Sequence, residues 1–536
     1  RNEYVYRPTY QFLKYVVEFD RPIYRPGQKI NIKAILLKRV PFGFRVLNSA
    51  KISVKILNPQ YQVVVEKTLE TNVQGAVSWS YDLPMTGMLG HYQVQLAATS
   101  PEIANHDYSR NFSDSFRVEE YKRPDYFVQV EKAKDPWIFE KEVKIKVVGK
   151  YYYGAPVKKG RIVYKISSQV YYPWYMDDGY HGGQDAGEDF ASGEGVLDDK
   201  GEYFITYTPK SKGSDSRRFV VTASVFDESG RSIDASAYYT ASKKEFFINS
   251  IAAKDFFKKN EKPTFTVKLE DLNGALFDGK VDYEVFELVP PTAAEKKKIK
   301  EELAQPVPSY GRRYYGDGYG SVDLKRGFIN LKTKSVNKGH WSVTKDKSDF
   351  SIGSLPEGVF KVTMQSKDSH GEKVDSDVYV MIADNGVKLS QYYIPEVTLQ
   401  SKPEFKIGET VSILFGSSEY SGHVVGFLLK NQLQLENPIF KTNQGVKVYD
   451  VKVTESMFNG SSFTWFSVFD NEIIQGRTMI KVNNDFKKLN ISFDKTSTIK
   501  PGQNSQLKIV NKSKVPDLEA MVSMYDQSLE FYATRN

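Results

Sequence analysis

Acidic side chains are concentrated in a Gly- and Tyr-rich stretch, residues 170–195, where the chain could bind a metal ion. Ca²⁺ prefers clustered carboxylate oxygens. The spacing does not match an EF-hand loop, and acidic glycine-rich loops are usually only solvated, so we predict a loop without a metal. The carboxylates concerned are Asp177, Asp178, Asp185, Glu188 and Asp189.

A second stretch, residues 310–327, combines glycine, tyrosine and arginine. Its sequence GDGYG (316–320) is similar to part of a phosphate-binding loop, but the GxGxxG and GxxxxGK patterns are absent. Arg312, Arg313, Tyr314 and Tyr315 have the chemistry to stack on single-stranded nucleic acid or to contact a protein. Because the net charge of +8 is spread over the whole chain, we predict no nucleic-acid binding and prefer a plain loop.

Catalytic chemistry finds little support in the remaining residues. The chain has no cysteine, which excludes thiol catalysis, disulfides and Cys-based zinc sites. No GxSxG pattern occurs, and no two histidines lie four residues apart. We therefore predict no enzyme activity, no catalytic residue, no metal and no cofactor. The histidines are His91, His106, His181, His340, His370 and His423.

The missing cysteines also favour a bacterial or intracellular source, since extracellular eukaryotic modules usually carry disulfides. No run of about 18 apolar residues is present, so we predict no transmembrane helix. The chain begins at Arg1 without an initiator methionine, and we expect it to be a piece of a longer protein.

Five turns, each followed by a strand with alternating apolar residues, recur along the chain. Alternation with a period of two indicates strands that lie on a sandwich core. A second repeat places a glycine before an aromatic and β-branched strand, and we interpret it as the end of each unit. The turn–strand repeats are at 24–36, 137–149, 257–269, 405–416 and 499–511; the second repeat is at 90–96, 201–207 and 357–363.

This spacing predicts an all-β chain of serial immunoglobulin-like antiparallel sandwiches, with one short surface helix in 289–308 that starts at Thr292. The predicted division is a tail (1–10), four sandwiches (11–120, 121–243, 244–388 and 389–485) and the start of a further domain (486–536). The second sandwich contains the loop 170–195, and the third contains the insertion 289–327.

Several of these segments resemble the alpha-2-macroglobulin family. FDRPIYRPGQKINIKAILLKR, from Phe19, is similar to the opening of a macroglobulin-like domain of the MG2 type. FRVEEYKRPDYFVQV (116–130) resembles the family's passage into its next domain. KYYYGAPVKKGRIVYKI (150–166) is similar to the segment in which a short Gly-x-Pro-Val turn precedes a long strand. The segment 499–532, with Tyr525 to Leu529 in it, resembles the domain that precedes the bait segment.

The resemblance implies a non-enzymatic scaffold in a bacterial protein that traps proteases, located in the periplasm and associated with the outer membrane. Its partners would be proteases or envelope proteins, with a membrane anchor elsewhere in the parent protein. The bait segment is expected after Asn536, and no Cys-x-Glu-Gln thioester motif occurs in this chain. The alternative is an extended adaptor in an outer-membrane transport or secretion complex. A third, weaker interpretation is a set of β-sandwich accessory domains of a carbohydrate-active or other enzyme, whose catalytic module would lie outside this chain.

The site residues that we predict are structural and form tight turns. Ile23 and Tyr24 are expected to pack at a sandwich edge, while Pro and Gly supply the fixed and positive φ angles that turns require. The turn residues are Asp20, Arg21, Pro22, Tyr24, Arg25, Pro26, Gly27, Gln28, Pro501, Gly502 and Gln503.

Overall fold

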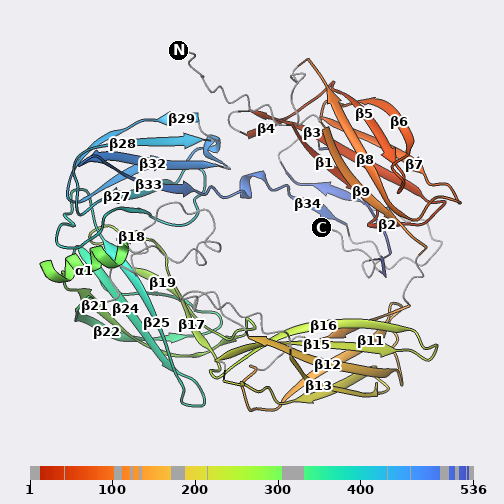
Figure 1. Ribbon diagram of the computed structural model, residues 1–536, viewed down its shortest axis with the longest axis horizontal. Helices are drawn as coiled ribbons and strands as arrows, with labels where there is room; N and C mark the ends of the chain where they lie inside the picture. The colour runs from red at the N-terminus through yellow and green to blue at the C-terminus, as the bar shows by residue number, and fades with distance from the viewer. Residues whose placement is uncertain are drawn as a thin grey trace. The chain divides into compact units, whose positions relative to one another are not determined.

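Strands in mostly antiparallel sheets make up 59% of the structure and helix only 4%, which confirms the predicted all-β fold class. The computed structural model describes residues 13–40, 43–101, 111–120, 125–131, 136–170, 188–213, 215–304, 331–430, 433–458, 460–494, 506, 508–513, 518–526 and 528–529. The chain divides into two compact units: Arg1–Asp125 with Asn483–Asn536, and Tyr126–Val482. Strands are labelled as in Figure 1.

Sandwich 1, in the first unit, packs the sheet β1-β3-β4 with β7 against the sheet β2-β9-β8-β5-β6. Its core takes the inward half of each alternating strand, such as Ile52, Val54 and Ile56 of β5. The strands are β1 (Leu13–Phe19), β2 (Ile23–Tyr24), β3 (Lys29–Val40), β4 (Gly43–Val46), β5 (Lys51–Leu57), β6 (Val63–Glu70), β7 (Ala76–Asp82), β8 (Gly90–Thr99) and β9 (Asn111–Val118).

Sandwich 2, in the second unit, packs β10-β11-β14 against β13-β12-β15-β16. The strands are β10 (Tyr126–Val130), β11 (Val143–Tyr151), β12 (Arg161–Val170), β13 (Glu188–Val196), β14 (Glu202–Tyr207), β15 (Ser216–Phe226) and β16 (Ser232–Ser242).

The expected loop 170–195 is wrong at its C-terminal end, where β13 pairs with β12. The glycines that suggested a loop lie under aromatic rings. A β-carbon at Gly193 would be 2.5 Å from Tyr164 Oη, and one at Gly195 would be 2.3 Å from Tyr203 Cε2. A glycine within a strand thus marks a close approach here rather than a loop.

Sandwich 3 packs β17-β19-β20 with β23 against β18-β25-β24-β21-β22. Helix α1 (Ala293–Ala304) starts after Thr292 as predicted, because Thr292 and Glu295 form a reciprocal capping box, and it buries Ile299. The strands are β17 (Phe247–Ala252), β18 (Phe256–Phe257), β19 (Thr264–Glu270), β20 (Leu276–Phe277), β21 (Gly279–Leu288), β22 (Thr333–Val343), β23 (Asp349–Ser351), β24 (Gly358–Lys367) and β25 (Lys373–Ile382).

Sandwich 4 packs β26-β27-β31 against β29-β28-β32-β33, with β30 beside β28. A separate buried apolar cluster, which includes Phe256, Met381, Leu389 and Leu414, joins sandwiches 3 and 4. The strands are β26 (Val397–Gln400), β27 (Thr410–Gly416), β28 (Ser421–Lys430), β29 (Leu433–Glu436), β30 (Ile439–Asn443), β31 (Val446–Lys452), β32 (Ser461–Phe469) and β33 (Glu472–Ile480); β34 (Ile491–Phe493) pairs with β35 (Ile509–Asn511) in the first unit.

The recurring turn has the same role in all four sandwiches. In each sandwich, a residue or short strand lies just before the turn. This segment pairs in parallel with the last strand of the same sandwich, or with the residues that follow that last strand. These parallel pairs are Ile23↔Arg117, Ile138↔Ser242, Phe256↔Met381 and Phe405↔Val482. The turn therefore holds the opening segment against the end of its own sandwich.

The second repeat is not the end of each unit, contrary to our interpretation. Residues 90–96 and 357–363 lie in β8 and β24, and each is followed by one more strand, β9 or β25. Residues 201–207 lie in β14, which pairs with β11 in the opposite sheet. A glycine before an alternating strand therefore predicts that a turn precedes the strand, but it does not predict where in the sandwich that strand lies.

A further turn recurs that the sequence analysis did not single out. An Asp or Asn accepts hydrogen bonds at its side-chain oxygen from the backbone N–H groups two and four residues later. In Asp227 both distances are 3.0 Å. The same turn is formed at Asn58, Asn72, Asp198, Asp271 and Asp368.

Candidate functional site

A hydrogen-bonded pair, the half-buried Asp20 and the buried Tyr24, organises the opening segment of sandwich 1. The Tyr24 hydroxyl donates to Asp20 Oδ1 at 2.7 Å and accepts from the Arg21 backbone N–H at 3.1 Å. Asp20 also accepts from the backbone and side chain of Asn31. Burial, together with the Asp20 carboxylate, raises the pKa of Tyr24 far above its usual range, so the phenol stays protonated. Ile23 and Tyr24 are fully buried, and Tyr24 lies in the core rather than only at an edge.

The predicted turn follows directly after this pair, from Arg25 to Gln28. Gln28 N–H donates to Arg25 C=O at 3.2 Å, and Gln28 Oε1 accepts from Arg25 N–H at 3.0 Å. Pro26 precedes Gly27, whose φ of 77° is the positive angle of a type II turn. The same side-chain hydrogen bond occurs in the corresponding turns of sandwiches 3 and 4. There the carboxylates of Glu261 and Glu409 accept from the backbone N–H groups of Lys258 and Lys406. The corresponding predicted residues Pro501, Gly502 and Gln503 lie outside the described residues.

A C-terminal segment, Leu518–Asp526, lies against sandwich 1 within the first unit. Glu519 Oε1 is 2.6 Å from Lys33 Nζ, and Glu519 Oε2 accepts from Asn72 Nδ2 at 2.7 Å. The Lys33 side chain is only 9% exposed. Hydrogen bonds from Lys33 and Asn72 lower the pKa of the Glu519 carboxyl, so it is ionised at neutral pH. We call this contact the C-terminal dock.

The C-terminal dock brings together the two motifs on which the family resemblance rests. Leu529 is 3% exposed and packs against Ile23, with Tyr525 beside them. A hollow of about 610 Å³ is lined by Asp20, Lys33 and residues 519–524. The opening motif and the motif from Tyr525 to Leu529 thus form one structural site. Sequence reasoning missed Lys33, Asn72 and Glu519, since no spacing pattern connects residues so far apart.

One group of possible metal ligands occurs in the described part of the chain. Ligand atoms of Glu245, Asp368 and His370 lie within 4.8 Å of one another. Both Asp368 oxygens already accept backbone hydrogen bonds, and Glu245 Oε2 accepts from Ser369 N–H. These bonds fasten the β24–β25 turn to the chain before β17. The arrangement is accounted for by this structural role.

The other candidates for chemistry are placed as follows. Three groups of candidate residues lie outside the described part of the chain. They are the carboxylates Asp177, Asp178 and Asp185, the stretch 310–327 with Arg312, Arg313, Tyr314 and Tyr315, and the histidines His106 and His181. Glu188 and Asp189 lie in β13. Within the described part of the chain, no helix is both long and apolar enough to cross a membrane.

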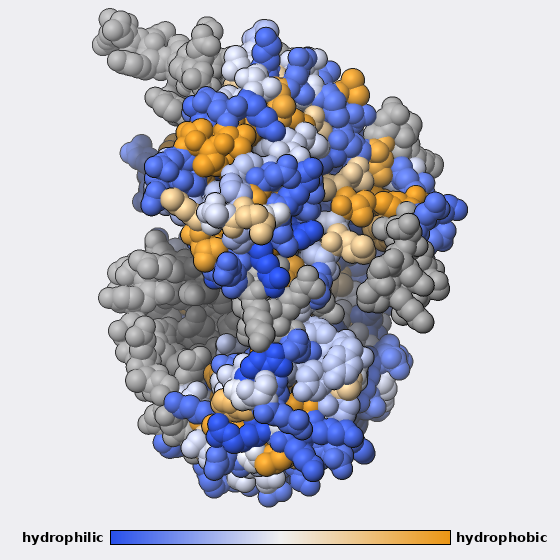
Figure 2. All heavy atoms as spheres, turned by 90° about the vertical axis from the view of Figure 1, so that its right-hand side faces the viewer, coloured by the Kyte–Doolittle hydropathy of each residue, from blue (hydrophilic) through white to orange (hydrophobic). Residues whose placement is uncertain are grey.

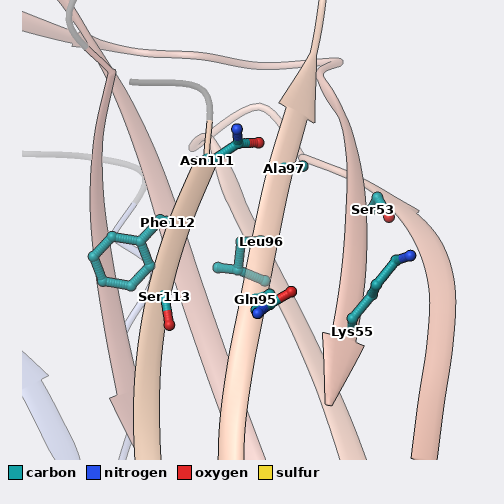
Figure 3. Close-up of a pocket in the computed structure, with 8 residues that line it drawn as sticks. All are labelled: Ser53, Lys55, Gln95, Leu96, Ala97, Asn111, Phe112 and Ser113. Carbon is teal, nitrogen blue, oxygen red and sulfur yellow. The ribbon is translucent and has the colours of Figure 1, made fainter. Parts of the chain in front are cut away.

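The outer face of β5, β8 and β9 in sandwich 1 carries mainly polar side chains. A shallow pocket of about 470 Å³ lies over β5, β8 and β9, where Lys55, Gln95 and Ser113 stand on neighbouring strands (Figure 3). On the face drawn in Figure 2, hydrophilic residues predominate and apolar residues form small separate groups. This pocket has the open, solvated character of an ordinary sheet face rather than of an active site.

Comparison with known proteins gives matches over both ends of the chain. The MG2 domain family matches residues 14–118, and the alpha-2-macroglobulin bait region domain family matches residues 397–530. Alpha-2-macroglobulin of Thermotoga maritima is 26% identical over 260 residues, which are 48% of this chain and 15% of that protein. Ovostatin of Gallus gallus is 27% identical over 142 residues, 26% of this chain and 9% of that protein.

The fold is also similar to a solved structure, trypsin-activated alpha-2-macroglobulin from Escherichia coli. The superposition covers 94% of this chain and 33% of that chain, with a TM-score of 0.50 and 13% identity. The chain therefore spans a third or less of the length of these relatives. The bait region match lies before Asn536, and the position of a cleaved segment stays a prediction.

Proposed function

Because this chain belongs to the alpha-2-macroglobulin family, we propose that it is a non-enzymatic scaffold in a protein that traps proteases. The observation that carries the proposal is the presence, in one chain and in this order, of an MG2 domain match and a bait region domain match. The Escherichia coli relative of similar fold is trypsin-activated, which supports a protease as partner here too.

The structure supports this proposal through the C-terminal dock. In a trap, a cut in an exposed segment must be transmitted to the rest of the protein as a change in domain arrangement. Glu519 and Leu529 hold the end of the bait region match against sandwich 1. We further propose a bacterial cell-envelope location for the parent protein, and domain limits at 11–120, 121–243, 244–388 and 389–485.

The test is limited proteolysis of the full-length parent protein by trypsin and by elastase. Cut sites are mapped, and small-angle scattering is recorded before and after cleavage. A trap gives cuts clustered in one segment, within the bait region match at 397–530 or after it, together with compaction and bound protease that cleaves small peptides but not large proteins. Cuts scattered over several loops with unchanged scattering would overturn the trap and favour an adaptor.

A further inference from the structure

The outer face of one sheet distinguishes sandwich 4 from the other three. Equivalent neighbouring strands form this face in each sandwich: β5-β8-β9, β12-β15-β16, β21-β24-β25 and β28-β32-β33. On the last strand of the first three sets, the outward side chains are mainly polar. They include Ser113 and Ser115 in β9, Asp234 and Ser236 in β16, and Asp375 and Asp377 in β25. Tyr238 in β16, which is 68% exposed, is an aromatic exception.

In sandwich 4 the same face carries a group of apolar side chains beside the polar Thr464 and Gln475, and we call this group the apolar face. It consists of Val425 and Phe427 on β28, Phe466 and Val468 on β32, and Ile473 on β33. Val425 pairs with Phe466, Val468 pairs with Ile473, and the rings of Phe427 and Phe466 stack with centroids 5.9 Å apart. Val468 is 63% exposed and Ile473 is 68% exposed. A contiguous patch of this kind marks an interaction surface.

The apolar face ends at an open sheet edge. β33 is the last strand of its sheet, at the left of Figure 1 below β32. In the described part of the chain no strand of this sheet pairs with its free side, and the bridge between Phe405 and Val482 lies beyond its end. β26 of the facing sheet packs against the inward side of β33, where a β-carbon at Gly476 would be 2.2 Å from Thr398 Oγ1. The N–H and C=O groups along most of β33 are thus available to an added strand, a common mode of peptide recognition.

Two positive charges lie on the apolar face, while the exposed Asp470 lies in the turn that joins β32 to β33. Arg477 on β33 and Lys441 on β30 are exposed and lie on the same side of the sheet as Ile473 and Val425. Neither forms an ion pair with a carboxylate among the described residues. Glu472 points to the opposite side, since side chains alternate along a strand. The complementary partner therefore carries apolar and acidic groups.

We propose that β33 binds an extended protein segment that carries an apolar residue and a carboxylate four residues apart. Residues four apart on a strand point to the same face, so the apolar residue lies beside Ile473 while the carboxylate lies beside Arg477. Main-chain hydrogen bonds continue the sheet, and the added strand extends the apolar face by one row. This inference does not depend on protease trapping.

The test is fluorescence anisotropy of the full chain with two labelled peptides. The first, acetyl-Ser-Glu-Val-Thr-Val-Val-Lys-amide, places its glutamate opposite Arg477 in an antiparallel pairing. The second replaces that glutamate by lysine. We expect saturable binding of the first peptide below about 1 mM, and binding of the second weaker by about five- to tenfold.

Charge reversal provides the decisive readout. Arg477→Glu should weaken binding of the first peptide by about five- to tenfold, and the variant should then bind the second peptide more tightly than the first. Ile473→Lys should weaken the binding of both peptides. The matched control Lys268→Glu, on a strand of sandwich 3, should leave the affinity for both peptides unchanged. Absence of saturable binding, or a preference unchanged by Arg477→Glu, would overturn the proposal. Self-association abolished by Ile473→Lys without peptide binding would instead identify a second copy as the occupant and also overturn it.

Discussion

Removal of the Glu519 carboxylate is predicted to loosen the C-terminal dock. In Glu519→Ala the ammonium of Lys33 loses its partner at 2.6 Å, and the amide of Asn72 loses its acceptor at 2.7 Å. Because the Lys33 side chain is 9% exposed, its ammonium is poorly solvated once the carboxylate is removed, and it gains full hydration only if the segment moves away. The free energy of local opening should therefore fall.

The size of the effect follows from the burial of the two partners. Breaking a fully buried ion pair costs about 3–5 kcal/mol, and a hydrogen bond to a charged group contributes about 1.5–3 kcal/mol. The Glu519 side chain is 30% exposed, which places the contact in the lower range. We expect a loss of about 2 kcal/mol, which is an increase of about 30-fold in the opening equilibrium.

Hydrogen–deuterium exchange of the amides in Leu518–Asp526 measures this opening directly. The matched control is Glu66→Ala, which removes the exposed ion pair between Glu66 and Lys55 and should change exchange by less than about fivefold. The double variant Lys33→Met with Glu519→Leu should regain most of the protection, because no buried charge is left unpaired. Equal effects of Glu519→Ala and Glu66→Ala would refute the reasoning.

The pH dependence of the same contact has a defined sign. The pKa of Glu519 is lower in the folded protein than its usual value of 4.5. Its contribution to stability is therefore present above pH 4.5 and is lost as the pH falls through the lower, folded pKa. Exchange of the segment should rise in that range in the wild-type protein and stay flat in Glu519→Gln.

Three further substitutions test other parts of the structure. Gly27→Ala should destabilise by about 1–2 kcal/mol in urea unfolding, because φ is positive there and a β-carbon would meet a neighbouring side chain; Gly213→Ala, with a positive φ but open space, should cost less. Burial raises the pKa of Glu396 to about 6, so wild-type stability should fall as the pH rises from 4.5 through 6. Glu396→Gln should remove that slope, and parallel pH profiles would contradict it. Asn273→Ala should lose two hydrogen bonds to the Thr240 backbone and about 1–2 kcal/mol, and unchanged exchange at Thr240 would contradict this.

The class of fold could be predicted from the sequence because its signals are local. Alternation in the segments around Ile30 and Val411 specified strands, and the pair Pro26-Gly27 specified a turn. The helix start at Thr292 was also correct, because a capping box needs only residues three apart. The glycines of β13 misled because their reason is a ring on another strand, Tyr164 or Tyr203.

The turns at Asp198, Asp227 and Asp368 could have been predicted from the sequence. Each reads Asp-x-x-Gly between two alternating strands, and the side chain that caps the turn is in the pattern itself. The C-terminal dock could not have been predicted from it. Lys33 and Glu519 are 486 residues apart, and a single lysine and a single glutamate among so many carry no pairing information.

The parallel pairs between opening turns and last strands also constrain how the chain folds during synthesis. Ile23 can find Arg117 only after roughly a hundred residues have been made, and Phe256 must wait similarly for Met381. Until then each opening segment is an unpaired strand edge, exposed to mispairing with its counterpart in the next sandwich. During translation, the last strand of each sandwich is synthesised before the following sandwich can fold. This order therefore favours pairing of each opening segment with its own last strand over pairing with the similar segments of other sandwiches.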